Sequence, residues 1–134
     1  MLKTACIHPE IMRLVSLCGH GDKILIADGN YPLDSKSGSA AKVYLGLTSG
    51  IPEVTQVLEV LSEVVNFEKA EVMVPTGEQP PIFAEFQNIL GGMDLGGLER
   101  QEFYDACCKP NVRLAIFTGE KRTFANILLT IGVA

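Results

Sequence analysis

The sequence predicts an α/β fold with a central, largely parallel or mixed sheet and helices on both faces. Segments with the spacing of an amphipathic helix alternate along the chain with short segments that are apolar at every position. Such continuous apolar runs are typical of strands buried on both faces, whereas half-solvated strands alternate polar and apolar residues. No repeat, linker or low-complexity tract interrupts the pattern, so residues 1–134 are expected to form a single domain.

The first half of the chain is expected to contain two helices and two strands. Residues 9–18 place apolar side chains at helical spacing, with a proline at the first turn and a glycine just beyond the end. The apolar run 24–27 stops at Asp-Gly-Asn, which indicates a buried strand, and residues 32–40 have the composition of a loop. A second strand is expected at 43–47, before a helix whose apolar residues keep the helical period from 54 to 65.

The second half repeats this alternation. Residues 70–74 form the next expected strand, and a proline-rich loop then leads to a helix over 82–89 that ends at two glycines. A short helix is expected at 101–107, and the apolar runs 114–117 and 127–131 complete the chain as strands.

Composition excludes several classes of protein. The formal net charge is −5 and the basic residues are scattered, so the sequence has no nucleic-acid-binding footprint. The N-terminal residues lack the apolar stretch of a signal peptide, and no apolar run approaches the roughly 20 residues of a membrane span. The four cysteines do not have the spacing of a redox or zinc motif and are expected to be free thiols. A cytoplasmic protein that binds neither nucleic acid nor membrane is therefore expected.

Two polar residues flank the first expected strand. His20 lies in a Gly-His-Gly-Asp turn before it, where a histidine is either a solvated turn residue or an acid/base group. Asp28 ends the strand, where it either stabilises a turn or binds a ligand beyond the carboxyl edge of the sheet. A zinc site that uses His8, His20 and nearby aspartates is disfavoured because no pair has a recognised metal spacing.

Two further candidates lie near the end of the chain. Arg100 either pairs with a surface carboxylate at a helix start or forks onto the vicinal hydroxyls or carboxylate of a ligand. Asn126 is either a turn residue or a residue that can both donate to and accept from a ligand hydroxyl. Nucleotide-binding glycine motifs and the nucleophile motif of hydrolases are missing. The residues alone thus indicate an α/β domain with a polar cleft near His20 and Asp28.

Several segments together resemble the ribose pyranase / fucose mutarotase family, in order and nearly end to end. The matching segments are Gly19–Asp22, Asp28 with Pro32, Leu47–Pro52, Glu99–Arg100, Phe103–Tyr104, Thr118–Glu120, Ala125–Leu129 and Gly132–Val133.

This resemblance implies a three-layer α/β/α, ribose-pyranase-like fold, usually assembled into homo-oligomeric rings or decamers. It implies interconversion of monosaccharide ring forms without cofactor or metal, with His20 as the proton donor. It further implies sugar binding by residues that this chain carries at five positions: Asp28, Arg100, Phe124, Ala125 and Asn126.

One site position departs from the family pattern. The family usually has tyrosine where this chain has Phe124, so the hydroxyl found there in relatives is missing. Tyr31, Tyr44 and Tyr104 are the candidates to supply a hydroxyl instead. Arg100 and the Phe103–Tyr104 pair favour the L-fucose mutarotase branch. The alternatives are a D-ribose pyranase, or a sugar-binding accessory protein of sugar uptake that does not catalyse.

Overall fold

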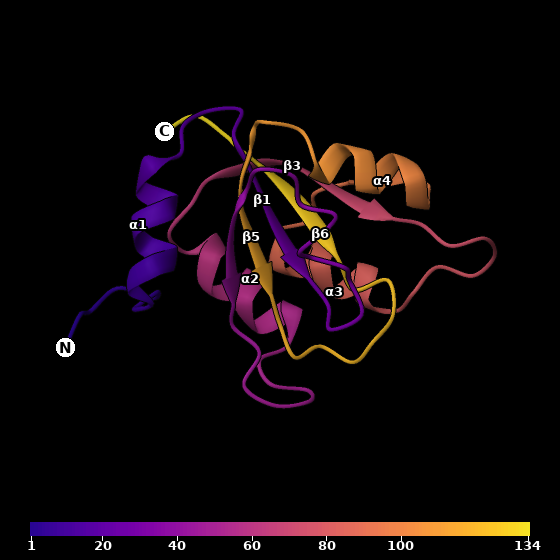
Figure 1. Cartoon of the computed structure of the whole chain (residues 1–134), viewed down its shortest axis with the longest axis horizontal. Helices are drawn as coiled ribbons and strands as arrows, with labels where there is room; N and C mark the ends of the chain where they lie inside the picture. Colours follow the sequence, from indigo (N-terminus) through magenta and orange to yellow (C-terminus); the bar gives the residue numbers. More distant parts are fainter.

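The computed structural model describes all residues from 1 to 134 as one six-stranded sheet with four helices (Figure 1). The helical and strand segments agree with the expected ones to within a few residues at each end, apart from one additional strand. In chain order they are α1 (Pro9–Leu17), β1 (Lys23–Ala27), β2 (Ala41–Tyr44), α2 (Val54–Ser62), β3 (Phe67–Met73), α3 (Ile82–Ile89), β4 (Leu95–Leu98), α4 (Arg100–Cys107), β5 (Val112–Phe117) and β6 (Ile127–Ile131).

The sheet is mostly parallel, as the sequence predicts. Its strand order is β2-β5-β1-β6-β3-β4, and β6 runs antiparallel to both of its neighbours. All other pairings are parallel. Because β6 is antiparallel, residues 118–126 do not cross the sheet but pass over the carboxyl end of β1 to reach the start of β6.

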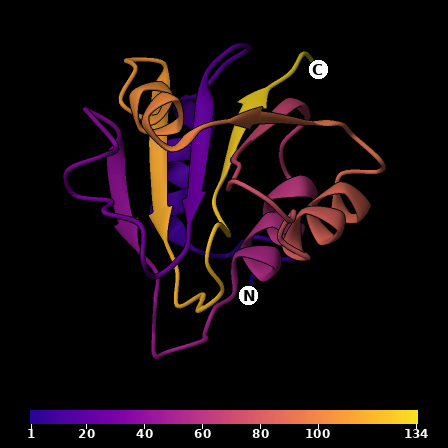
Figure 2. The same ribbon diagram turned by 90° about the vertical axis from the view of Figure 1, so that its right-hand side faces the viewer.

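Helices cover both faces of the sheet, which confirms the three-layer architecture. Side chains of a strand alternate between faces, so Ile24 and Ile26 pack with α1, α2 and α3, whereas Leu25 and Ala27 face α4. Figure 2 shows α4 in front of the strands and α1 behind them. None of the helices is both long and apolar enough to cross a bilayer.

Strand β4 is the element that the sequence did not predict. Its sequence is Leu-Gly-Gly-Leu, and glycine is depleted in strands. A Cβ atom at Gly97 would lie 2.9 Å from Cγ1 of Val74, so this edge strand requires a glycine for its close approach to β3. The close packing that selects the glycine is visible only once β3 and β4 are paired.

Candidate functional site

A polar cavity of about 240 Å³ lies at the carboxyl edge of the sheet, between the end of β1, the start of α4 and the segment 118–126. Such edges are the usual ligand-binding positions of α/β sheets. The cavity brings together four of the residues predicted to bind a ligand. Its lining consists of Asp28, Asn30, Tyr31, Met73, Arg100, Tyr104, Thr123, Phe124 and Asn126.

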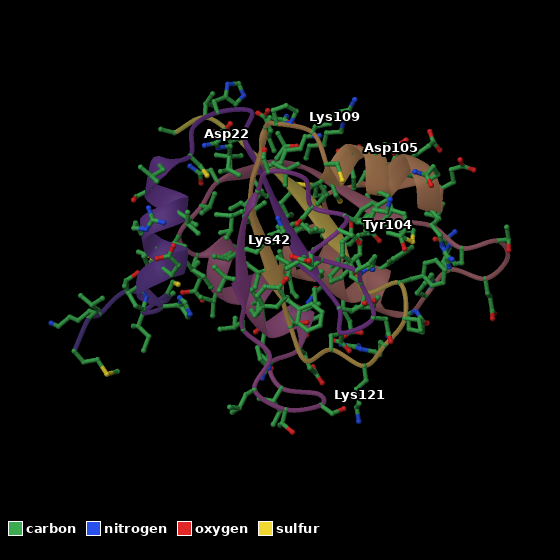
Figure 3. All side chains as sticks on the ribbon, viewed as in Figure 1. Asp22, Lys42, Tyr104, Asp105, Lys109 and Lys121 are labelled. Carbon is green, nitrogen blue, oxygen red and sulfur yellow. The ribbon has the colours of Figure 1, made fainter.

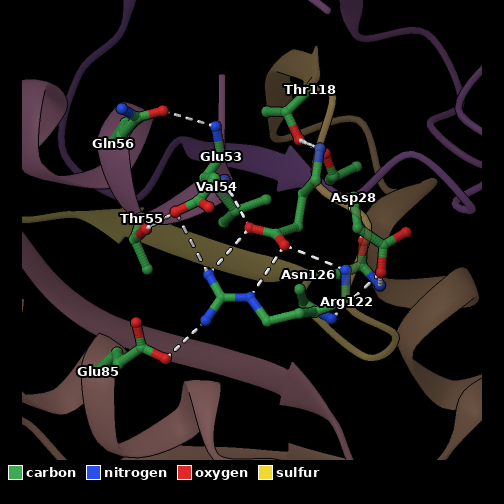
Figure 4. Close-up of polar contacts among 12 residues, drawn as sticks. Asp28, Glu53, Val54, Thr55, Gln56, Glu85, Thr118, Arg122 and Asn126 are labelled. Carbon is green, nitrogen blue, oxygen red and sulfur yellow. Dashed lines mark hydrogen bonds and ion pairs between the residues drawn. The ribbon is translucent and has the colours of Figure 1, made fainter. Parts of the chain in front are cut away.

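Asp28 is the most constrained polar group of this cavity. It is only 1% exposed, and its carboxylate accepts hydrogen bonds from the main-chain N–H groups of Asn30 at 2.9 Å and Ala125 at 3.1 Å. The side chain of Asn126 donates to the same carboxylate at 3.3 Å and accepts from the Asp28 N–H at 2.7 Å (Figure 4). Burial raises the pKa of Asp28, and the hydrogen bonds from Asn30 and Ala125 offset this only in part.

Ala125 therefore has a role without lining the cavity. Its side chain is fully buried, and its N–H fixes one oxygen of Asp28. The segment that carries Ala125 and Asn126 reaches Asp28 because β6 starts beside the end of β1.

Two side chains of α4 bring unpaired donors to the cavity. Arg100, the first residue of the helix, makes neither an ion pair nor a side-chain hydrogen bond, and the hydroxyl of Tyr104 has no partner in the chain. By contrast, the Tyr31 hydroxyl donates to the Lys36 carbonyl at 2.7 Å. Tyr44 packs on Phe117 and does not line the cavity. Of the three candidate tyrosines, Tyr104 thus has the free hydroxyl at the site.

Phe124 adopts an unusual backbone conformation. Its φ is 58°, the only positive value at a residue other than glycine, and its ring packs on the α4 side of the sheet. A bulky residue in this region costs about 1–3 kcal/mol and persists only where the surroundings impose it, which happens most often at functional sites.

His20 does not lie in the cavity of its own chain. The turn that carries it precedes β1, whereas Asp28 follows β1. A strand rises about 3.3 Å per residue, so Asp22 and Asp28 are on the order of 20 Å apart. Figure 3 shows this separation: Asp22 lies at one edge of the sheet and Lys121, in the segment 118–126, at the opposite edge.

The immediate surroundings of His20 suit acid/base chemistry. Its Nε2 lies 2.9 Å from a carboxylate oxygen of Glu68, and its side chain is 56% exposed. Nδ1 makes no hydrogen bond within the chain, which leaves one ring nitrogen free for another molecule. A carboxylate on one imidazole nitrogen fixes the tautomer and the orientation of the ring.

His8 has a structural position. Its Nδ1 accepts from the N–H of Ile11 at 3.2 Å and caps α1. Nowhere in the chain do three or more histidine, cysteine, aspartate or glutamate side chains gather in a way that could hold a metal ion.

Three lining residues were not named as candidates from the sequence: Asn30, Met73 and Thr123. Asn30 and Thr123 are close in sequence to Asp28 and Phe124, which is the only sequence signal for them. Met73 ends β3, so its place at the cavity depends on the strand order.

The fold and this cavity define a small α/β protein with a candidate site for a polar molecule at the carboxyl edge of its sheet. The whole chain, residues 1–134, matches the RbsD / FucU transport protein family, and the protein belongs to that family.

Relatives from both branches of the family are similar over nearly the full length. The fucose mutarotase of Homo sapiens is 33% identical over 96% of this chain and 90% of its own. The D-ribose pyranase of Staphylococcus haemolyticus is 32% identical over 99% of this chain and 98% of its own. RbsD of Bacillus subtilis, solved in complex with D-ribose, is 27% identical, has a TM-score of 0.86 and covers 100% of this chain and 99% of its own.

Proposed function

We propose that this protein is a sugar mutarotase that interconverts the α and β anomers of L-fucose or a related monosaccharide by acid/base ring opening. The observation that carries the proposal is the cavity in which Asp28, Arg100 and Asn126 converge. Its volume, about 240 Å³, lies just below the ~300–1,000 Å³ of sites for drug-sized ligands and suits a small polar molecule. Membership of a family that includes fucose mutarotases and D-ribose pyranases supports the same chemistry.

The reaction needs one proton given to the ring oxygen and one removed from the anomeric hydroxyl. The open-chain aldehyde then rotates and closes again on its other face. A histidine can give and take such protons near neutrality, a contribution of typically ~10²–10⁴-fold. We assign this role to His20, with Glu68 holding its ring through Nε2.

Asp28, Arg100 and Asn126 then fix the sugar. The remaining lone pairs of Asp28 accept hydroxyl protons, Arg100 donates from its unpaired guanidinium, and Asn126 holds Asp28 in one orientation. Binding in one orientation matters because a catalytic group contributes little to a loosely held substrate.

The separation of His20 from the cavity has a direct consequence for this mechanism. Within one chain the two halves of the site lie at opposite ends of β1. We therefore propose a homo-oligomer, such as a ring or decamer, in which one copy places its exposed His20 over the Asp28 cavity of a neighbouring copy.

D-ribose pyranase activity is the alternative, and the similarity to ribose-specific relatives favours it. Sugar binding without catalysis is a further alternative, which the missing hydroxyl at Phe124 favours. Arg100 and the Phe103–Tyr104 pair resemble the fucose-type branch and favour that reaction. Tyr104, at the cavity with an unpaired hydroxyl, can supply the hydroxyl missing at Phe124, which favours catalysis over binding alone.

Saturation-transfer NMR on equilibrated L-fucose, D-ribose, D-galactose and D-glucose tests the proposal. We expect faster anomer exchange for one sugar, and its loss with unchanged sugar binding in His20→Gln. The matched control is His8→Asn, which keeps a helix-capping side chain and removes the other histidine. Acceleration of pyranose–furanose exchange alone would support the pyranase, and binding without any acceleration would support the accessory role.

A further inference from the structure

We infer that Glu120 and Arg122 form a clamp that positions the sugar-binding segment Thr123–Phe124, and that both are positioning residues for the site. The inference rests on the proposed function for the identity of the ligand, whereas the geometry of the clamp does not depend on that function. Neither residue lines the Asp28 cavity, so both act through the residues that do.

Glu120 is a buried carboxylate with several hydrogen-bond donors around it. Its side chain is 3% exposed. It accepts from the N–H of Val54 at the start of α2 at 3.2 Å, and from the N–H of Arg122 at 3.1 Å. The Arg122 guanidinium adds contacts from Nε at 2.9 Å and Nη2 at 3.1 Å.

Arg122 extends the network to two helices (Figure 4). Its Nη1 donates to Glu85 of α3 at 2.7 Å, and Nη2 lies 3.7 Å from Glu53, the residue that caps α2. The guanidinium therefore bridges three carboxylates: Glu120, Glu53 at the cap of α2 and Glu85 in α3. Only a planar, multiply donating group can make all these contacts together.

The charges of the clamp reinforce each other. Burial alone would raise the pKa of Glu120, but the hydrogen bonds from Arg122 and Val54 outweigh it and hold that pKa below its usual value. The hydrogen bonds and charge of Glu120, with Glu85 and Glu53 nearby, raise the pKa of Arg122. The ion pair is therefore maintained throughout the neutral pH range.

The clamp holds one end of a short bridge of chain. Besides its side-chain contacts, Glu120 accepts from the N–H of Gly29 through its carbonyl at 2.9 Å, next to Asp28. At the other end of the bridge, Ala125 and Asn126 are bonded to Asp28 itself. Thr123 and Phe124, between these anchors, make no hydrogen bond of their own.

The bridge adopts a conformation that its sequence alone does not favour. Phe124 has a φ of 58°, in the left-handed region of backbone conformations. A bulky residue without local hydrogen bonds keeps this conformation only if the residues on both sides of it are held in place. Because Thr123 and Phe124 line the cavity, any relaxation of the bridge changes the site. Loss of the clamp should thus reduce the fraction of molecules competent to bind, which weakens the apparent affinity by the same factor.

The test compares Arg122→Met, Arg122→Lys and the control Arg13→Met in the full chain. Arg13 pairs only with Glu10 on the exposed side of α1, so its variant removes an arginine–carboxylate pair elsewhere. Two quantities are measured at a temperature where melting curves show each variant folded. They are the hydrogen-exchange rate of the Ala125 amide relative to Leu128 in β6, and L-fucose or D-ribose binding and exchange by NMR.

We expect Arg122→Met to speed exchange of the Ala125 amide about tenfold and leave that of Leu128 unchanged. The sugar dissociation constant should rise about tenfold while anomer exchange at saturating sugar stays within about twofold. Arg122→Lys should lie between Arg122→Met and wild type, because one ammonium replaces only part of the fork. Arg13→Met should change neither quantity.

The clamp would be overturned if the ratio of Ala125 to Leu128 amide exchange were the same in Arg122→Met as in wild type. It would also be overturned if Arg122→Met melted at a lower temperature but bound the sugar with unaltered affinity. If the wild-type protein binds no sugar, the proposed function fails, and the ratio of Ala125 to Leu128 exchange alone decides whether the clamp positions the segment.

Discussion

Asp28 and Asn126 hold each other through a reciprocal pair of hydrogen bonds. The Asp28 N–H donates to Oδ1 of Asn126 at 2.7 Å, and Nδ2 of Asn126 donates to the Asp28 carboxylate at 3.3 Å. The two residues flank antiparallel neighbours, the end of β1 and the start of β6, so this contact closes the carboxyl edge of the sheet. It also fixes which oxygen lone pairs of a 1% exposed carboxylate remain for a ligand.

Replacement of Asn126 by aspartate tests this pairing. Asn126→Asp removes the Nδ2 donor and brings a second buried carboxyl against Asp28, so we expect a loss of about 1–3 kcal/mol in unfolding free energy near neutral pH. Two adjacent carboxyls raise the pKa of one of them in the folded state. When the pKa of a carboxyl is higher in the folded than in the unfolded state, the unfolding free energy is highest at low pH. It falls as the pH rises through the folded-state pKa.

Urea unfolding at about pH 5 and about pH 8 measures this effect, and the deficit of Asn126→Asp relative to wild type should be larger at the higher pH. Asn66→Asp is the control, because Asn66 is exposed and its side chain only donates to the Val133 carbonyl. A deficit of equal size at both pH values would mean that the new carboxyl does not interact with Asp28.

A mixture of two inactive variants tests whether neighbouring copies share the site. His20→Gln removes the proton donor, and Arg100→Met removes a ligand of the cavity at the opposite edge of the sheet. If each site takes His20 from one copy and Arg100 from another, co-expressed mixed oligomers regain anomer exchange at roughly a quarter of their sites. Exchange rates of mixed and single-variant preparations provide the comparison, and no recovery in the mixture would argue against a site shared between copies.

The sequence was sufficient to predict the layers of the fold and to name four residues that line one cavity. Apolar runs and helical spacing depend on local residues, which is why β1, α2 and β6 appear where expected. Strand β4 was missed because Gly97 is selected by its contact with Val74, which directly follows the neighbouring strand β3. The separation of His20 from Asp28, by contrast, could have been predicted, because the two residues flank an expected strand whose rise of about 3.3 Å per residue places them at opposite ends.

The choice among the three tyrosines shows the same limit. Sequence offered Tyr31, Tyr44 and Tyr104 as equivalent replacements for the hydroxyl missing at Phe124. Only the structure separates them, since the Tyr31 hydroxyl is already bonded to Lys36 and Tyr44 lies outside the cavity.

Removal of the Tyr104 hydroxyl should weaken sugar binding. Tyr104→Phe keeps the ring that packs edge-on against Tyr31 at 5.5 Å and removes the one free phenol of the cavity. A lost hydrogen bond of about 0.5–1.5 kcal/mol corresponds to a rise of about two- to tenfold in the sugar dissociation constant. Titration of the protein with sugar, followed by NMR, measures the dissociation constant, and Tyr44→Phe is the control because it removes an exposed hydroxyl outside the cavity.

A second substitution makes the Tyr104 prediction specific. Adding Phe124→Tyr to Tyr104→Phe returns a hydroxyl to the cavity from the neighbouring position, so we expect affinity to recover in part. If Tyr104→Phe and Tyr44→Phe bind sugar equally well, Tyr104 does not contact the ligand.

The Glu120 carboxylate should make the stability of the protein depend on acid pH. Its pKa is lowered in the folded state from an ordinary value of 4.5, so its contribution is complete above about pH 4.5 and is lost as pH falls through the lower folded value. Glu120→Gln removes this ionisation, so its unfolding free energy should lie furthest below that of wild type near neutrality and approach it below about pH 4.5. Urea unfolding between about pH 3 and pH 7 measures the difference, with Glu78→Gln, in an exposed loop, as the control. A difference that does not change over this range would show that packing, rather than the charge of Glu120, accounts for its contribution.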